Sequence, residues 1–334
     1  VASNRARASR SSRESRGKLR PHCCRGSAAR WRSAQRRIAA AGLCSCGIER
    51  ACHDAAVSPC RKSPALPSLD LDRDSDDLKP PSGLLLALEG RALLEWASLA
   101  LASPVLDKAP RGDGHAVLVL PGFVAGDSST WPLRRFLAQR GYAAQPWRLG
   151  LNTGPRGRMG QRLAARLRAV AKRHGGKVSL VGWSLGGAMA HALALRAPEL
   201  VRCVVTLGSP LGGEPRATNA WRLFEAISGY RADDPRLKKR LAGVPRVPTT
   251  SILSKTDGIV NWRTSLLPDH DCAENIEVSA SHFGMGANPA VLWAIADRLA
   301  QPEGAWQPFA HAGPWRRLFF GDPRRRSLAD WIAP

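Results

Sequence analysis

Apolar residues in this chain form either short uninterrupted runs or longer stretches with helical spacing. The uninterrupted runs are typical of strands that are covered on both faces of a sheet. They predict strands at 115–123, 177–184 and 201–210, with further strands near 145–149, at 249–257 and at 275–283. Because these strands alternate with helical stretches, we expect an α/β fold with a mostly parallel sheet of about six strands.

The helical spacing predicts helices at 84–101, 158–174, 185–197 and 288–300, and partly helical structure at 214–247. In the first helix, Glu89, Arg91 and Glu95 interrupt a broad apolar face. We expect that face to pack against the core, and contact with a membrane surface is the alternative. The many arginines of the second helix are most simply explained as a solvated face.

The charge of the chain is concentrated near its N-terminus. The 334 residues include 50 Lys and Arg against 27 Asp and Glu, a formal net charge of +23. Residues 1–62 contain 15 basic and three acidic residues, a net charge of +12, so the remaining residues carry +11. The same segment holds six of the eight cysteines. Whole-chain averages, which suggest a nucleic-acid binder, therefore describe two different kinds of sequence.

Residues 1–62 have few large apolar residues, so we expect a basic, cysteine-containing and disordered leader. Three other roles stay open: a basic arm that binds nucleic acid or anionic lipid, a zinc site, and a targeting peptide. The cysteines lack the paired Cys-x-x-Cys spacing of a structural zinc site. The apolar run at 38–43 is short for an export signal.

Composition divides the rest of the chain into three parts. Residues 63–82 are rich in proline and acidic residues, which indicates a linker. Residues 83–300 carry the predicted strands and helices and form the expected globular domain. Residues 301–334 form an aromatic and basic tail, which we expect to dock its aromatic side chains on the domain, with contact to a membrane surface as the alternative.

A serine stands at the junction between the strand at 177–184 and the helix that follows. The segment Gly182-Trp183-Ser184-Leu185-Gly186 matches G-x-S-x-G in the strand–turn–helix context that a nucleophile elbow requires. Its glycines permit a sharp, strained turn at the serine. A phosphate-binding loop is the alternative, but neither G-x-G-x-x-G nor G-x-x-x-x-G-K-[ST] occurs there. Ser184 is therefore the candidate nucleophile.

A serine nucleophile needs a histidine base, and the base needs an acid to orient it. In sites of this kind the acid and then the histidine follow along the chain, each after a strand. Asp257 ends the run at 249–257, and His282 follows the run at 275–281. Other acids and histidines lie in loops, in the tail, on helices or at the opposite end of a strand: Asp269, Asp271, His115, His174, His191, His270 and His311.

Acyl transfer also needs two backbone N–H groups that stabilise the oxyanion. The candidates are the amides of Leu185, directly after the serine, and of Phe123, in the loop after the first strand. An ordinary turn is the alternative for that loop. Apolar residues near strand ends could line an acyl pocket, with core packing as an equal alternative, and these are Phe123, Trp183, Trp131, Leu211 and Trp262.

The motifs VLVLPGF, GWSLGG, VVTLGSPLGG, SKTDGIV and SHFGM resemble the α/β-hydrolase family, and within it the bacterial lipases and carboxylesterases. The resemblance covers about Gly83–Ala300 and implies helices on both faces of the sheet and a short cap. It implies Ser184 as nucleophile, His282 as general base and acid, and Asp257 as the orienting carboxylate. The chain departs from many lipases in having Pro121 before the glycine of the oxyanion loop. The first two strands of a full hydrolase sheet are not evident.

The expected activity is hydrolysis of carboxylic esters with an apolar acyl group, through an acyl-enzyme on Ser184. It requires no metal or organic cofactor, and the substrate would be a small-molecule or lipid ester, with no obligatory nucleic-acid partner. Transfer of the acyl group to an alcohol or to peroxide is the main alternative, followed by a non-catalytic scaffold and nucleic-acid binding by the leader. No segment reads as a membrane span, and the lack of a clear signal favours the cytoplasm.

Overall fold

The computed structural model describes residues 78–311 and 313–323. The predicted leader at 1–62 and most of the predicted linker at 63–82 lie outside these residues, as does the end of the tail. In the described part of the chain, none of the helices combines the length and the apolar character needed to cross a bilayer.

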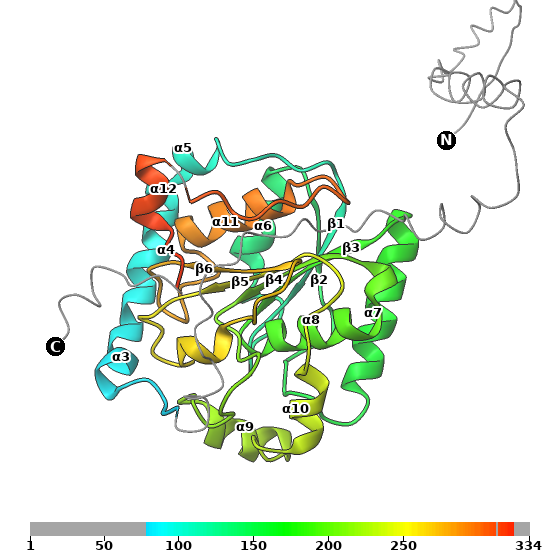
Figure 1. Cartoon of the computed structure of the whole chain (residues 1–334), viewed down its shortest axis with the longest axis vertical. Helices are drawn as coiled ribbons and strands as arrows, with labels where there is room; N and C mark the ends of the chain where they lie inside the picture. Colours follow the sequence, from blue (N-terminus) through cyan, green and yellow to red (C-terminus); the bar gives the residue numbers. More distant parts are fainter. Residues whose placement is uncertain (1–77, 312, 324–334) are drawn as a thin grey trace, which may run out of the picture. The chain divides into compact units, whose positions relative to one another are not determined.

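Six parallel strands form one sheet in the order β2-β1-β3-β4-β5-β6 (Figure 1). They are β1 (Ala116–Leu120), β2 (Ala143–Pro146), β3 (Val178–Trp183), β4 (Val201–Leu207), β5 (Thr249–Leu253) and β6 (Ala273–Glu277). The strand order reverses beside β1, because β2 lies on one side of it and β3 on the other. The loops that leave the carboxyl ends of β1 and β3 therefore meet at a switch point, where α/β sheets place their ligands.

Helices cover both faces of this sheet (Figure 1). Helices α5 (Ser103–Leu106), α6 (Trp131–Gln139) and α11 (Pro289–Leu299) share one apolar core with the sheet. On the opposite face, α7 (Met159–His174) and α8 (Leu185–Arg196) form the second core. Helices α9 (Trp221–Ser228) and α10 (Pro235–Leu241) lie between β4 and β5 and form the short cap. The expected α/β-hydrolase architecture is thus confirmed.

Some predicted elements extend beyond the observed ones. Strands β5 and β6 end four and five residues before Asp257 and His282, so both side chains stand on loops beyond the sheet. Short 3₁₀ turns, η2 (Pro198–Leu200) and η3 (Trp262–Ser265), add to the connections. After β6, Val278 and Ala280 alternate with serines and continue the strand-like pattern of the sequence, although the strand itself ends at Glu277.

The predicted helix at 84–101 is wrong in its continuity and in the face that it buries. It is divided into α3 (Gly83–Ala87), the 3₁₀ turn η1 (Leu88–Arg91) and α4 (Ala92–Leu101). Glu89 is buried at 5% exposure, whereas Leu93 and Leu101 are 78% and 84% exposed. The polar side chains face the domain because they bind the backbone of the loops that follow β5 and β6.

The tail packs on the α11 face as far as the structure describes it. Phe309 and Phe320 are buried in the core that α11 shares with the sheet, and their ring centroids are 5.0 Å apart. Glu277 at the end of β6 pairs with Gly321 in an antiparallel bridge. Helix α12 (Pro314–Phe319) lies between these two contacts and leaves Trp315 43% exposed. Apolar packing therefore accounts for much of the aromatic content of the tail.

Candidate active site

Ser184 occupies a strained turn between β3 and α8. Its φ of 55° and ψ of −126° are unusual for a residue with a side chain. The turn depends on close backbone packing, since a Cβ on Gly182 would lie 2.4 Å from the Cα of Gly187. A Cβ on Gly186 would lie 2.4 Å from the carbonyl oxygen of Pro121. The glycines of the motif therefore allow the turn after β3 to approach the loop after β1.

Asp257 and His282 are brought together from two separate loops. The Nδ1 of His282 and the Oδ2 of Asp257 are 2.7 Å apart, and both residues are buried at 3% exposure. The other oxygen of Asp257 accepts hydrogen bonds from the amides of Ile259 and Val260, each at 2.8 Å. With its Oδ1 so occupied, the carboxylate presents Oδ2 to the imidazole. This arrangement places a proton on Nδ1 and leaves Nε2 as the acceptor.

The charges around His282 favour its protonated form. Burial by itself disfavours the imidazolium and lowers the pKa of His282. The negative charge and the hydrogen bond of Asp257 act in the opposite direction, as does the charge of Glu89. Together they outweigh burial, so the pKa of His282 is raised above its usual value.

Trp183 connects the nucleophile turn to the histidine loop. Its indole Nε1 donates a hydrogen bond of 3.0 Å to the carbonyl oxygen of His282, and the two ring centroids are 6.2 Å apart. The hydrogen bonds found among residues 78–311 and 313–323 do not include one between Ser184 Oγ and His282 Nε2. Such contacts often tighten only when substrate binds. The structure thus pairs Asp257 with His282, and it places Trp183, the neighbour of Ser184 in the sequence, against His282.

The amides of Phe123 and Leu185 are available to a ligand. Within the described residues, neither amide nitrogen donates a hydrogen bond to a protein oxygen, apart from the bonds inside helix α8. Leu185 is the first residue of α8, and the N–H groups in the first turn of a helix have no carbonyl oxygen of a preceding turn to bind. Both residues line the same cavity as Ser184. Two amides beside a serine hydroxyl can bind a developing oxyanion.

Asn152, which was not among the residues predicted for the site, holds the loop that carries Phe123. The residue is fully buried, and its Nδ2 donates a hydrogen bond of 2.9 Å to the carbonyl oxygen of Pro121. Its backbone exchanges bonds of 2.8 Å with Val124 and Ala125. No motif marks Asn152, because its role depends on two loops that meet only at the switch point.

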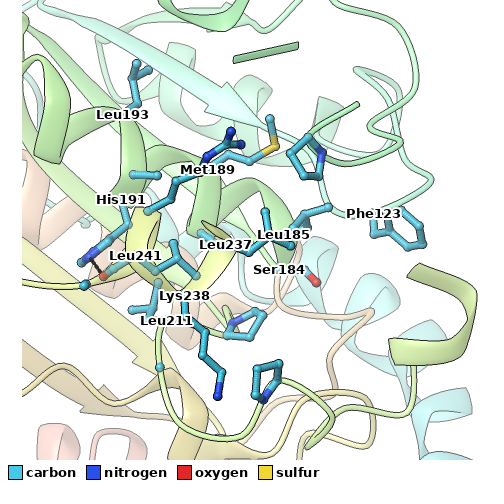
Figure 2. Close-up of a pocket in the computed structure, with 18 of the residues that line it drawn as sticks. Phe123, Ser184, Leu185, Met189, His191, Leu193, Leu211, Leu237, Lys238 and Leu241 are labelled. Carbon is cyan, nitrogen blue, oxygen red and sulfur yellow. Dashed lines mark hydrogen bonds between the residues drawn. The ribbon is translucent and has the colours of Figure 1, made fainter. Parts of the chain in front are cut away.

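A cavity of about 650 Å³ begins at Ser184 and runs between α8 and the cap (Figure 2). Phe123, Ser184 and Leu185 lie at one end of it, and His191 and Leu241 lie toward the other (Figure 2). Most of the lining side chains are apolar, and they include Leu163 of α7, Met189 of α8, Leu211, Phe224 of α9 and Leu237 of α10. The cavity can accept an extended apolar group whose end reaches the serine.

Of the residues predicted to line a pocket, Phe123 and Leu211 line this cavity and the three tryptophans do not. Trp183 points to the opposite face of the sheet and packs in the core with α11, as alternation along β3 requires. Trp131 is 55% exposed and contacts the guanidinium of Arg135. Trp262 lies beside the cation of Lys255. The sequence did offer one signal, the nearly all-apolar composition of α8. A helix without a polar face is covered on every side, so α8 had to lie beneath further elements, and the apolar cavity is found between α8 and the cap.

The other histidines considered as bases lie away from this pair. His115 binds Ser179 through Nε2 at 2.8 Å, at the amino ends of the strands. His191 lies on α8, and its Nε2 contacts the carbonyl oxygens of Leu241 and Gly243 at 3.2 and 3.0 Å, which ties the cap to the helix. Burial lowers the pKa of His191. In the described ranges, no three His, Cys, Asp or Glu residues are grouped so that they could hold a metal ion.

A family model agrees with this architecture, and several solved structures are similar to the chain. Residues 116–243 match the family model for the alpha/beta hydrolase fold. No curated protein matches the chain. Lipase B of Aspergillus fumigatus has a similar solved structure, at 16% identity over 57% of this chain and 53% of that chain, with a TM-score of 0.43. The chain therefore spans about half the length of that lipase.

Two further solved structures are similar to a comparable degree. The mature lipase BlEst2 of Bacillus licheniformis is 17% identical, with 58% of this chain and 95% of that chain covered and a TM-score of 0.45. The monoacylglycerol lipase of Paleococcus ferrophilus is 15% identical, with 57% and 96% covered and a TM-score of 0.42. At such identities the likeness does not specify a reaction. The sheet order, the strand–serine–helix turn and the matched family model together show that the described part of the chain has the alpha/beta hydrolase fold.

Proposed function

We propose that the protein is a serine hydrolase that cleaves carboxylic esters with an apolar acyl group. The observation that carries this proposal is the position of Ser184, which stands at the end of an apolar cavity beside the amides of Phe123 and Leu185. The buried Asp257–His282 pair supplies the base that a serine needs. Each part alone occurs in other contexts, but their combination suits acyl transfer.

In the proposed reaction, Ser184 Oγ attacks the ester carbonyl carbon while His282 Nε2 accepts its proton. The carbonyl electrons move to the oxygen, and the amides of Phe123 and Leu185 stabilise the resulting oxyanion. Collapse of the intermediate breaks the bond to the alkoxide, which leaves with the proton from His282. Water then attacks the acyl-enzyme with the same histidine as base, and the acid is released with Ser184 restored. Asp257 stabilises the imidazolium in both halves.

The apolar cavity leads us to expect activity that depends on the length of the acyl chain. Replacing Leu237 of α10 with tryptophan would narrow the cavity and should lower kcat/KM for a laurate ester by about tenfold or more. The butyrate ester, which needs less of the cavity, should react at nearly the original rate. Rates of p-nitrophenyl ester hydrolysis measure both.

Leu223→Trp is the matched control, because Leu223 lies on the neighbouring cap helix, is 53% exposed and does not line the cavity. It should leave the ratio of the two rates unchanged. If Leu237→Trp also leaves that ratio unchanged, the acyl chain does not occupy this cavity.

The raised pKa of His282 predicts the pH dependence of the reaction. The histidine must be neutral to accept the proton of Ser184, so kcat/KM should increase as pH rises through the pKa of the free enzyme. Because Asp257 and Glu89 raise that pKa, the midpoint of the acid limb should lie above the usual histidine value. A profile of kcat/KM against pH checks this, and a midpoint below the usual value would contradict the assigned base.

A further inference from the structure

A buried carboxylate outside the proposed catalytic pair binds the backbone of both partner loops. Oε1 of Glu89 accepts hydrogen bonds from the amide of Gly258 at 2.7 Å and from the amide of His282 at 2.9 Å. Its Oε2 accepts a third, from the amide of Phe283 at 3.0 Å. Both oxygens act only as acceptors, and Glu89 is 5% exposed.

These contacts join segments that are far apart in the sequence. Gly258 directly follows Asp257, and His282 is contacted at its own amide, so one side chain bridges the two loops whose side chains form the acid–base pair. Glu89 lies 169 residues before Gly258 and 193 before His282. A side chain fixed to both loops restricts their separation, and with it the geometry of the contact between Asp257 and His282.

Glu89 forms no salt bridge with any of the described residues. Arg91, on the same turn, instead binds Thr256 and Ala280 through their carbonyl oxygens and lies 3.5 Å from Glu95. A buried carboxylate without a counter-ion is costly to fold, and here it lies near a second carboxylate, Asp257. The three amide hydrogen bonds to Glu89 offset part of that cost.

We propose, on the basis of the function proposed above, that Glu89 is a positioning residue for the reaction. It holds the loops of Asp257 and His282 together, and it adds a second negative charge beside the imidazole that becomes positive when Ser184 loses its proton. Stabilisation by a fixed charge at a developing charge is strongest in a site that excludes water. The segment at 83–101 is then part of the active site rather than a surface helix.

In the described part of the chain, four charged side chains bind His282 or the two residues before it. Asp257 lies on the loop after β5, and Glu89 lies on η1. Two further charged side chains bind the residues just before His282: Arg91 at the carbonyl oxygen of Ala280 and Glu95 at the amide of Ser281. Within residues 78–311 and 313–323, Glu89 and Asp257 are the two residues whose carboxylates form hydrogen bonds with His282 itself.

The test replaces Glu89 with glutamine, which preserves size and removes the charge. We expect kcat for ester hydrolysis to fall by about tenfold to a hundredfold with little change in KM. We also expect the acid limb of kcat/KM to move to lower pH, because a charge that raises the pKa of His282 is lost. NMR titration of the proton between His282 and Asp257 should show the same direction of shift, and it requires no substrate.

Glu274→Gln is the matched control. Glu274 is also a largely buried carboxylate that accepts a backbone amide hydrogen bond, from Phe309 at 2.6 Å, but it lies on β6 and pairs with Arg298. It should lower stability without moving either titration. If Glu89→Gln behaves like this control, with an unmoved titration of His282, the positioning role is wrong. If the NMR titration moves but the wild-type protein hydrolyses no ester, the contact of Glu89 with the pair stands and the proposed function fails.

Discussion

Replacing Ser184 with alanine should reduce the turnover of p-nitrophenyl esters by a factor on the order of 10⁵ to 10⁶. Only the hydroxyl group is lost, and alanine retains the Cβ that the strained backbone of the turn already accommodates, so the fold should persist. Binding in the cavity should change little, because Ser184 supplies one small group among many apolar lining residues. Steady-state kinetics and thermal unfolding of the purified variant measure the two effects.

Ser129→Ala provides the matched control at the same rim. Ser129 lies in the loop after β1, and its hydroxyl donates a hydrogen bond of 2.8 Å to the carbonyl oxygen of Gly126. Its loss should alter the rate no more than a few-fold. Labelling with a fluorophosphonate gives a second readout, since wild type and Ser129→Ala should be labelled and Ser184→Ala should not. Comparable turnover by wild type and Ser184→Ala would remove Ser184 from the chemistry.

Replacing Asp257 with asparagine should lower kcat at neutral pH by about 10³ to 10⁴, the scale of the loss when a serine–histidine site loses its acid. The amide can still accept the hydrogen bonds of Ile259 and Val260 through its oxygen. Its NH₂ group would then face Nδ1 of His282, which forces the proton to Nε2 and removes the base. The loss of negative charge should also move the acid limb of kcat/KM to lower pH, because Asp257 raises the pKa of His282.

Asp271→Asn tests whether Asp271, another acid considered from the sequence, orients the histidine in place of Asp257. Asp271 is exposed on the loop before β6, and it should be replaceable with little effect on kcat. The kinetic comparison of the two variants at several pH values decides between them. A large loss in Asp271→Asn together with a normal rate in Asp257→Asn would transfer the role of the acid to the other loop.

The sheet was predictable because its strands are short and almost entirely apolar. Runs such as Ala116–Leu120 have few ways to bury themselves other than between two layers of helices. The turn at Ser184 was predictable for a related reason, since glycines on both sides of a serine after such a run have a narrow range of explanations. The ends of the strands were less predictable, because a strand ends where the neighbouring strand no longer offers hydrogen-bond partners.

The inward face of the segment at 83–101 could not be predicted from its pattern. Leucines favour the interior on average, so the pattern predicted that the apolar face packs against the core, with Glu89 as an interruption of that face. Glu89 turns inward because three amides from distant loops lie there, and each donates a charge-assisted hydrogen bond to its carboxylate. The general preference of glutamate for the protein surface was overridden at Glu89 by contacts that exist only after the sheet has formed.

The amino-acid sequence alone determined the α/β class, the strand–turn–helix at Ser184 and the choice of Asp257 and His282 as candidate partners. These depend on local patterns and on the order of residues along the chain. Only the tertiary structure decided that the cavity lies between α8 and the cap, that three tryptophans stay out of it, and that Glu89 joins the two partner loops. Each of these features depends on which surfaces pack against each other, and segments that are distant in the sequence come into contact only when the chain folds.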